Sequence, residues 1–94
     1  MQNKIKTYIG FAIKSGEFVS GLNDVLKRRS LPIILVDPAL AENSRKKLSQ
    51  KSRDVFTVQN LAELTNGSKV FAITNNELAS ACKEILSKEI LEEI

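Results

Sequence analysis

Two short runs of purely apolar residues constrain the fold of this 94-residue chain more than any other feature. Ile33-Ile34-Leu35-Val36 and Val70-Phe71-Ala72-Ile73 contain no polar side chain. A strand with one face in water alternates apolar and polar residues, whereas a strand covered on both faces is apolar throughout. Four residues fit a strand and fall far below the roughly 20 that a membrane helix needs. We therefore expect two buried strands with helices on both sides of a sheet.

The remaining segments show the patterns of helices and shorter strands. Apolar residues at helical spacing begin at Ile5, and Gly16 is placed to end that first helix. The other expected elements are helices from Ser20 or Gly21 to near Ser30, from Glu42 to Ser52, from Leu61 to Leu64 and from after Asn75 or Asn76, and strands at 18–19 and 55–58. This order predicts an α/β protein, a single domain over residues 1–94. Its architecture should be a three-layer α/β/α sandwich with a central mixed sheet of about four strands.

Local residue types suggest how some of these elements end. Asn60, with Glu63 three residues on, has the pattern of a capping box for the short helix that follows. Asn66-Gly67 is typical of a turn. Cys82 falls on the apolar side of the last helix, which predicts a buried structural thiol.

Missing residue types exclude several kinds of site. The chain has no histidine and one cysteine, so a four-ligand structural zinc site and a Ser-His or Cys-His nucleophile cannot be built. We expect no metal, no cofactor and no catalytic residues. The remaining enzyme hypothesis is a carboxylate pair such as Asp24 with Glu17. A lone cysteine and the lack of a visible secretory signal or membrane span predict a cytoplasmic protein.

The net charge of +3 is unevenly distributed along the chain. Residues 1–47 hold nine Lys or Arg against four acids, and residues 48–94 hold five against seven. Two basic clusters, Lys27-Arg28-Arg29 and Arg45-Lys46-Lys47, lie in the first half. Clustered cations release counterions when they meet phosphate, which favours a nucleic-acid partner. A solvated helix surface explains one such cluster equally well.

The candidate binding residues are Gly21, Asn23, Asp24, Lys27 and Arg28, where a short strand leads through a glycine into a helix. Asn23 and Lys27 are four residues apart and therefore share a helix face. An asparagine amide both donates and accepts hydrogen bonds, and an aspartate accepts from the adjacent N–H donors of a guanine edge. Basic residues beside them suit the phosphate backbone, so the group can recognise unpaired or non-canonically paired RNA bases. The alternative is that these are ordinary first-turn residues of a helix.

The stretch Gly21-Leu22-Asn23-Asp24-Val25-Leu26-Lys27 resembles the Gly-x-Asn-Glu-x-x-Lys signature of the L-seven-Ae and L-thirty-e ribosomal protein family. The preceding Gly16 to Gly21 is similar to the Gly-Lys-Leu-Val-Ser-Gly of its bacterial members. Weaker similarities run across nearly the whole chain, at Tyr8 to Ala12, Ile33 to Asp37 and Leu61 to Leu64.

The resemblance implies a three-layer sandwich that binds kink-turn RNA. In the family the signature Asn and Glu contact the guanines of tandem sheared G·A pairs, and the Lys supports them. By position these roles fall to Asn23, Asp24 and Lys27, with Gly21 allowing a close approach. The implied partners are structured RNA, including ribosomal RNA, and the ribosome or other ribonucleoprotein components.

Three positions depart from the family pattern. Asp24 stands for the family's Glu, Glu17 stands for a Lys and is expected to bring an anion near the phosphate, and residues 65–68 form a short loop where the family has a longer one. These departures motivate an alternative function. In it, the chain is a protein-interaction module that has kept the fold and lost specific RNA recognition.

Overall fold

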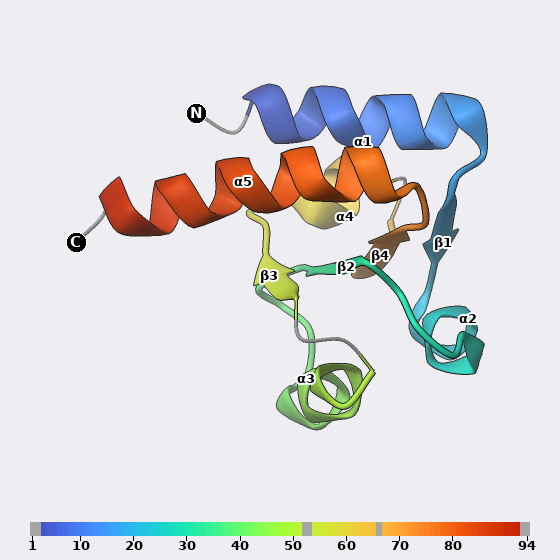
Figure 1. The fold of residues 1–94 in the computed structure, drawn as a ribbon. Coiled ribbons are helices and arrows are strands. Elements are labelled where there is room, and N and C mark those ends of the chain that lie inside the picture. The colour runs from blue at the N-terminus through green and yellow to red at the C-terminus, as the bar shows by residue number, and fades with distance from the viewer. Residues whose placement is uncertain (1–2, 52–53, 66, 93–94) are drawn as a thin grey trace.

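The computed structural model describes residues 3–51, 54–65 and 67–92 (Figure 1). The elements are α1 (Asn3–Ser15), β1 (Phe18–Ser20), α2 (Leu22–Lys27), β2 (Ile33–Val36), α3 (Glu42–Ser49), β3 (Val55–Thr57), α4 (Leu61–Leu64), β4 (Val70–Ile73) and α5 (Asn76–Glu92). They follow the expected order. The expected end of α3, Ser52, lies outside the described residues. The helix already ends at Ser49, after which the N–H groups of Gln50 and Lys51 each bond to a carbonyl only three residues back.

The four strands form one sheet in the order β1-β4-β2-β3. β4 is antiparallel to both β1 and β2, whereas β2 and β3 are parallel. The expectation of a mixed sheet of four strands is thus confirmed. The two fully apolar strands, β2 and β4, occupy the centre, where each is covered on both faces.

The buried side chains fall into two clusters on opposite faces of the sheet. Alternate strand residues, Ile33, Leu35, Phe71 and Ile73, pack with residues of α1, α4 and α5. The intervening residues of β2 and β4 pack with Val25 of α2 and Leu48 of α3. Figure 1 shows α1, α4 and α5 above the strands and α2 and α3 below them. Because successive side chains of β2 and β4 point to opposite faces, each central strand packs against both helical layers of the α/β/α sandwich.

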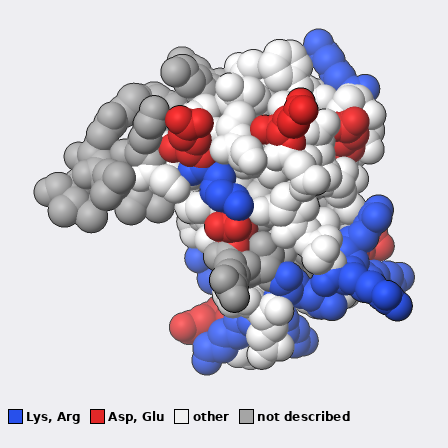
Figure 2. All heavy atoms as spheres, in the orientation of Figure 1, with Lys and Arg blue, Asp and Glu red and all other residues white. Residues whose placement is uncertain are grey.

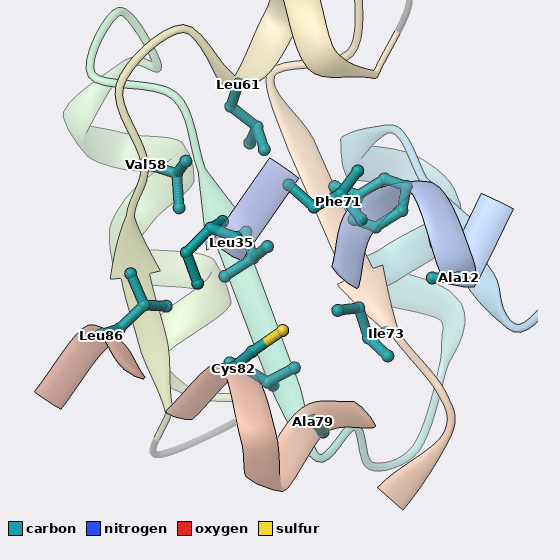
Figure 3. Close-up of a cluster of buried hydrophobic side chains, with 12 residues drawn as sticks. Ala12, Leu35, Val58, Leu61, Phe71, Ile73, Ala79, Cys82 and Leu86 are labelled. Atoms are coloured by element: carbon teal, nitrogen blue, oxygen red, sulfur yellow. The ribbon is translucent and has the colours of Figure 1, made fainter. Parts of the chain in front are cut away.

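Cys82 lies in the larger of these clusters, as the sequence predicts. Its side chain is fully buried, and Figure 3 shows its sulfur among the apolar side chains contributed by the sheet and α5. Burial raises the pKa of the Cys82 thiol to about 11, because the thiolate is poorly solvated there. The thiol is therefore structural.

The expected capping box at α4 is wrong. Asn60 takes a left-handed conformation with φ 60°, and its side chain makes no capping hydrogen bond. The Ala62 N–H of the first turn instead donates to Asp37 Oδ2 at 3.1 Å. At α5, by contrast, the Asn75 side chain accepts from the N–H groups of Glu77 and Leu78, which confirms the expected start of that helix.

Candidate nucleic-acid interface

At one end of the sheet, β1, β2 and β3 end, the antiparallel strand β4 begins, and β1 leads into α2. The Gly21 N–H donates to the Val70 carbonyl oxygen at 2.9 Å, and the Asp37 N–H donates to the Lys69 carbonyl oxygen at 2.9 Å. Thr57, the last residue of β3, pairs with Val36 at the same end. We call this end, defined by Gly21, Asp37, Thr57 and Lys69, the Gly21 rim.

The glycine at the rim has a backbone conformation that other residues rarely adopt. Gly21 has φ 92° and ψ 142°, and its carbonyl accepts the first bond of α2 from the Val25 N–H. This geometry turns the chain sharply from β1 into the helix. The candidate residues Asn23, Asp24, Lys27 and Arg28 follow at once, and all four are exposed. The candidate residues thus lie on α2 and at its two caps, Gly21 and Arg28.

Two further cations, Lys69 and Arg45, lie at this site, and the sequence did not predict that they would. Strand pairing places Lys69 there, and hydrogen bonds place Arg45. Lys69 directly precedes β4 and is exposed beside the strand residue that bonds to Gly21. Arg45 of α3 donates to Thr57 Oγ1 at 3.0 Å and to the Asp37 carbonyl oxygen at 3.3 Å. Since adjacent strands lie about 4.8 Å apart, the rim from β1 to β3 is about 14 Å wide. No local pattern marks Lys69; only the register of β4 with β1 identifies it.

Asp37 is the acidic residue of the Gly21 rim, and its carboxylate forms hydrogen bonds within the protein. Its carboxylate accepts from the N–H groups of Ala39 at 2.9 Å and Ala62 at 3.1 Å. These two backbone hydrogen bonds hold the pKa of Asp37 below its usual value of 3.8, and the positive charges of Lys69 and Arg45 lower it further. Both carboxylate oxygens of Asp37 are therefore bonded within the protein. Lys69 of the rim and Asn23, Asp24 and Lys27 of α2 beside it are exposed.

Glu17, expected to lie beside the candidate site, is at the end of the sheet opposite Gly21. It precedes β1, four residues before Gly21, and four extended residues span about 13 Å. Its carboxylate accepts a hydrogen bond from the Asn75 side chain. With Thr74, Asn76 and Glu77, these two residues line a shallow open pocket. Asp24 and Glu17 are thus far apart, and the hypothetical catalytic carboxylate pair does not form.

The layer formed by α2 and α3 carries more exposed cations than acids. Among the described residues, the exposed cations of α2, α3 and the segments next to them are Lys27, Arg28, Arg29, Lys46 and Lys47, and the exposed acids are Asp24 and Glu42. Figure 2 shows blue side chains gathered over α2 and α3 in the lower half of the view, with most red side chains higher up. The two basic clusters of the sequence therefore share one face of the molecule, adjoining the Gly21 rim.

The short loop between α4 and β4 is closed by Thr65. The Thr65 hydroxyl lies 2.8 Å from the carbonyl oxygens of both Leu61 and Ser68. Gly67, with φ 99°, donates its N–H to the Ala62 carbonyl oxygen. Asn66 of the expected Asn-Gly turn lies outside the described residues. Thr65 and Gly67 are thus bonded back to α4, and Lys69, which follows the loop, is exposed.

Within the described residues, no three His, Cys, Asp or Glu side chains converge to hold a metal ion. No helix in the described ranges has the length and apolar character needed to cross a membrane. Neither a scan against protein-family models nor a search of the curated proteins finds a match for this chain.

Proposed function

We propose that this chain binds structured RNA of the kink-turn type at the Gly21 rim, as a component of the ribosome or another ribonucleoprotein. One observation carries the proposal: strand pairing sets the exposed Lys69 beside the start of α2, where Asn23, Asp24 and Lys27 are exposed. Base-reading amide and carboxylate groups thus lie within reach of phosphate-binding cations. Direct contacts to base edges specify an RNA, and contacts to phosphates position it.

The chemistry of each side chain suggests which part of the RNA it contacts. Asn23 donates to and accepts from a base edge, and Asp24 accepts from the paired N–H donors of guanine. Lys27 shares the helix face of Asn23, and Arg28 follows it, so both are placed to hold the backbone. Sheared G·A pairs suit such a reader because their guanine edges are accessible, unlike those in the deep, narrow major groove of a regular RNA helix.

A calorimetric titration tests the proposal. The chain is titrated with a kink-turn RNA and with a duplex of the same length in which Watson–Crick pairs replace the G·A pairs. We expect tighter binding to the kink-turn RNA and loss of that preference in Asn23→Ala. Asp24→Glu restores the longer carboxylate of the resembling family, so it should strengthen the preference. Equal affinity for the two RNAs, or no binding, contradicts the proposal.

A second candidate function, a protein-interaction module, is favoured by Phe11. This side chain is 52% exposed on α1, in the layer opposite α2 and α3, and contacts Tyr8 edge to face at a centroid distance of 6.4 Å. Exposed aromatic residues are common in protein interfaces. A partner captured from nuclease-treated lysate by the wild type and lost in Phe11→Ser supports this function. Capture that is abolished by nuclease supports RNA binding instead.

A further inference from the structure

We infer that α3 is a second phosphate-binding surface, which contacts a helical stem next to the RNA element read at the Gly21 rim. The inference rests on the proposal that the chain binds RNA. It assigns a role to Lys46 and Lys47, which belong neither to the predicted signature nor to the rim. Both are exposed, and neither forms an ion pair or hydrogen bond through its side chain with any described residue.

The position of α3 relative to α2 is fixed by a shared core. Val25 of α2 and Leu48 of α3 are both fully buried in the cluster beneath the sheet. Helices packed in this way have axes about 8–10 Å apart. The exposed lysines of α3 therefore belong to the same rigid layer as Lys27, Arg28 and Arg29.

Arg45 joins α3 directly to the Gly21 rim. Its guanidinium spans from the helix to the Thr57 hydroxyl and the Asp37 carbonyl oxygen. This leaves Lys46 and Lys47, the next two residues, on the outer surface of the helix. The helix that carries these lysines is thus fixed before any RNA arrives, which lowers the entropy lost on binding.

The composition of α3 favours a phosphate backbone over a membrane surface. Its one large apolar side chain, Leu48, is fully buried, so the exposed face carries only polar and charged groups. A helix that lies on a membrane needs an apolar face to insert among the lipids. Evenly exposed lysines without that face suit a soluble polyanion, whose charges are neutralised by contacts to phosphate.

The size of the molecule sets the length of RNA required. Its longest extent is 31 Å, which an A-form RNA duplex rising about 2.8 Å per base pair covers in about eleven pairs. A kink-turn RNA with a stem of about three pairs reaches the Gly21 rim alone. One with a stem of about twelve pairs is long enough to lie across α3 as well.

The test compares Lys46→Gln/Lys47→Gln with Lys6→Gln/Lys14→Gln, whose lysines are exposed on α1 in the opposite layer. Glutamine has nearly the helix propensity of lysine, so both variants should keep their helices. Affinity for the long-stem and short-stem RNAs is measured over a range of salt concentrations. We expect the α3 variant to bind the long-stem RNA about tenfold more weakly. Its salt slope, d log K/d log[salt], should be smaller by about 1.4 to 1.8, since each of the two phosphate contacts contributes about 0.7–0.9.

The α3 variant should bind the short-stem RNA as the wild type does, and the α1 variant should match the wild type on both RNAs. If the α3 and α1 variants have the same affinity and salt slope, the inference is wrong, even when the preference for kink-turn RNA stands. A reduced slope without that preference supports α3 as a phosphate surface and contradicts the proposed function. Absence of any RNA binding overturns both.

Discussion

Asp37 and Ala62, 25 residues apart in the chain, are joined by a hydrogen bond of 3.1 Å from the Ala62 N–H to Asp37 Oδ2. The other carboxylate oxygen accepts from the Ala39 N–H at 2.9 Å. One side chain at the end of β2 thereby supports both its own turn and the first turn of α4. The buried carboxylate of Asp37 is thus stabilised by two backbone N–H groups and by the nearby positive charges of Lys69 and Arg45.

Asp37→Asn should unfold at a lower temperature than the wild type at pH 7. An amide keeps one accepting oxygen and presents an NH₂ group to the other backbone N–H, so one bond is lost. Thermal unfolding followed by circular dichroism measures the difference. Glu63→Gln is the matched control, since Glu63 is exposed on α4 and its side chain caps nothing in the described residues. A control as destabilised as Asp37→Asn contradicts the assigned role.

The same contact predicts how stability depends on pH. Because the folded pKa of Asp37 lies below 3.8, the unfolded chain takes up a proton first as the pH falls. The contribution of Asp37 is therefore complete above about pH 3.8 and is lost as the pH falls through the folded pKa. We expect Asp37→Asn to lose less stability than the wild type between pH 5 and about pH 2 in urea titrations. Parallel pH profiles for the two proteins would show that Asp37 is not the group responsible.

Two glycine-to-alanine changes should have opposite effects. Space is open around a Cβ at either Gly21 or Gly10, so neither substitution causes a clash. Gly21 has φ 92°, a region nearly closed to residues with a Cβ, and Gly21→Ala should lower the free energy of unfolding by about 1–3 kcal/mol. Gly10 lies within α1, where Gly10→Ala should raise it by about 0.5–1 kcal/mol. The midpoints of urea unfolding measure both, and a change of the same sign contradicts the backbone argument.

The order of elements was predictable because the apolar runs 33–36 and 70–73 admit only buried strands, and short polar segments separate the helices from them. The cap of α4 was not, because its partner is Asp37, far away in sequence, and the local pattern pointed to Asn60. The grouping of the candidate residues was predictable only where they are close in sequence. Asn23, Asp24, Lys27 and Arg28 follow one glycine, whereas Lys69 joins them only through strand register. Glu17 precedes β1 and Gly21 follows it, so the two residues lie at opposite ends of the sheet.

Substitutions at Asn60 separate a capping role from a backbone role. A serine is a good capping residue but a poor one in the left-handed conformation found there, at φ 60°. Asn60→Ser should therefore reduce the free energy of unfolding by about 1 kcal/mol, and Asn60→Gly should leave it nearly unchanged. Urea unfolding distinguishes these outcomes. A serine variant as stable as the wild type would restore the capping interpretation.

Cys82 should resist thiol reagents while the protein is folded. Burial raises its pKa from 9.0 to about 11, which lowers the thiolate fraction near pH 8 by about a hundredfold, and the buried sulfur is also shielded from the reagent. Labelling by a chromogenic disulfide should be slow at pH 8 and fast in urea. Cys82→Ser leaves a hydroxyl among apolar side chains and should cost about 1–3 kcal/mol. Rapid labelling of the folded protein contradicts the structural role.

Lys69→Gln tests whether the Gly21 rim, and not only the α2 signature, contacts RNA. The Asp37 N–H bonds to the backbone carbonyl of Lys69, so the substitution removes a charge and preserves the strand contact. We expect weaker binding to kink-turn RNA and a salt slope smaller by about 0.7–0.9, the contribution of one phosphate contact. Lys14→Gln is the control, because Lys14 is exposed on α1, whose last turn leads to Glu17 at the other end of the sheet. If Lys14→Gln weakens binding as much as Lys69→Gln, the attraction depends on net charge. A loss confined to Lys69→Gln instead assigns the contact to the rim, because the two variants carry the same net charge.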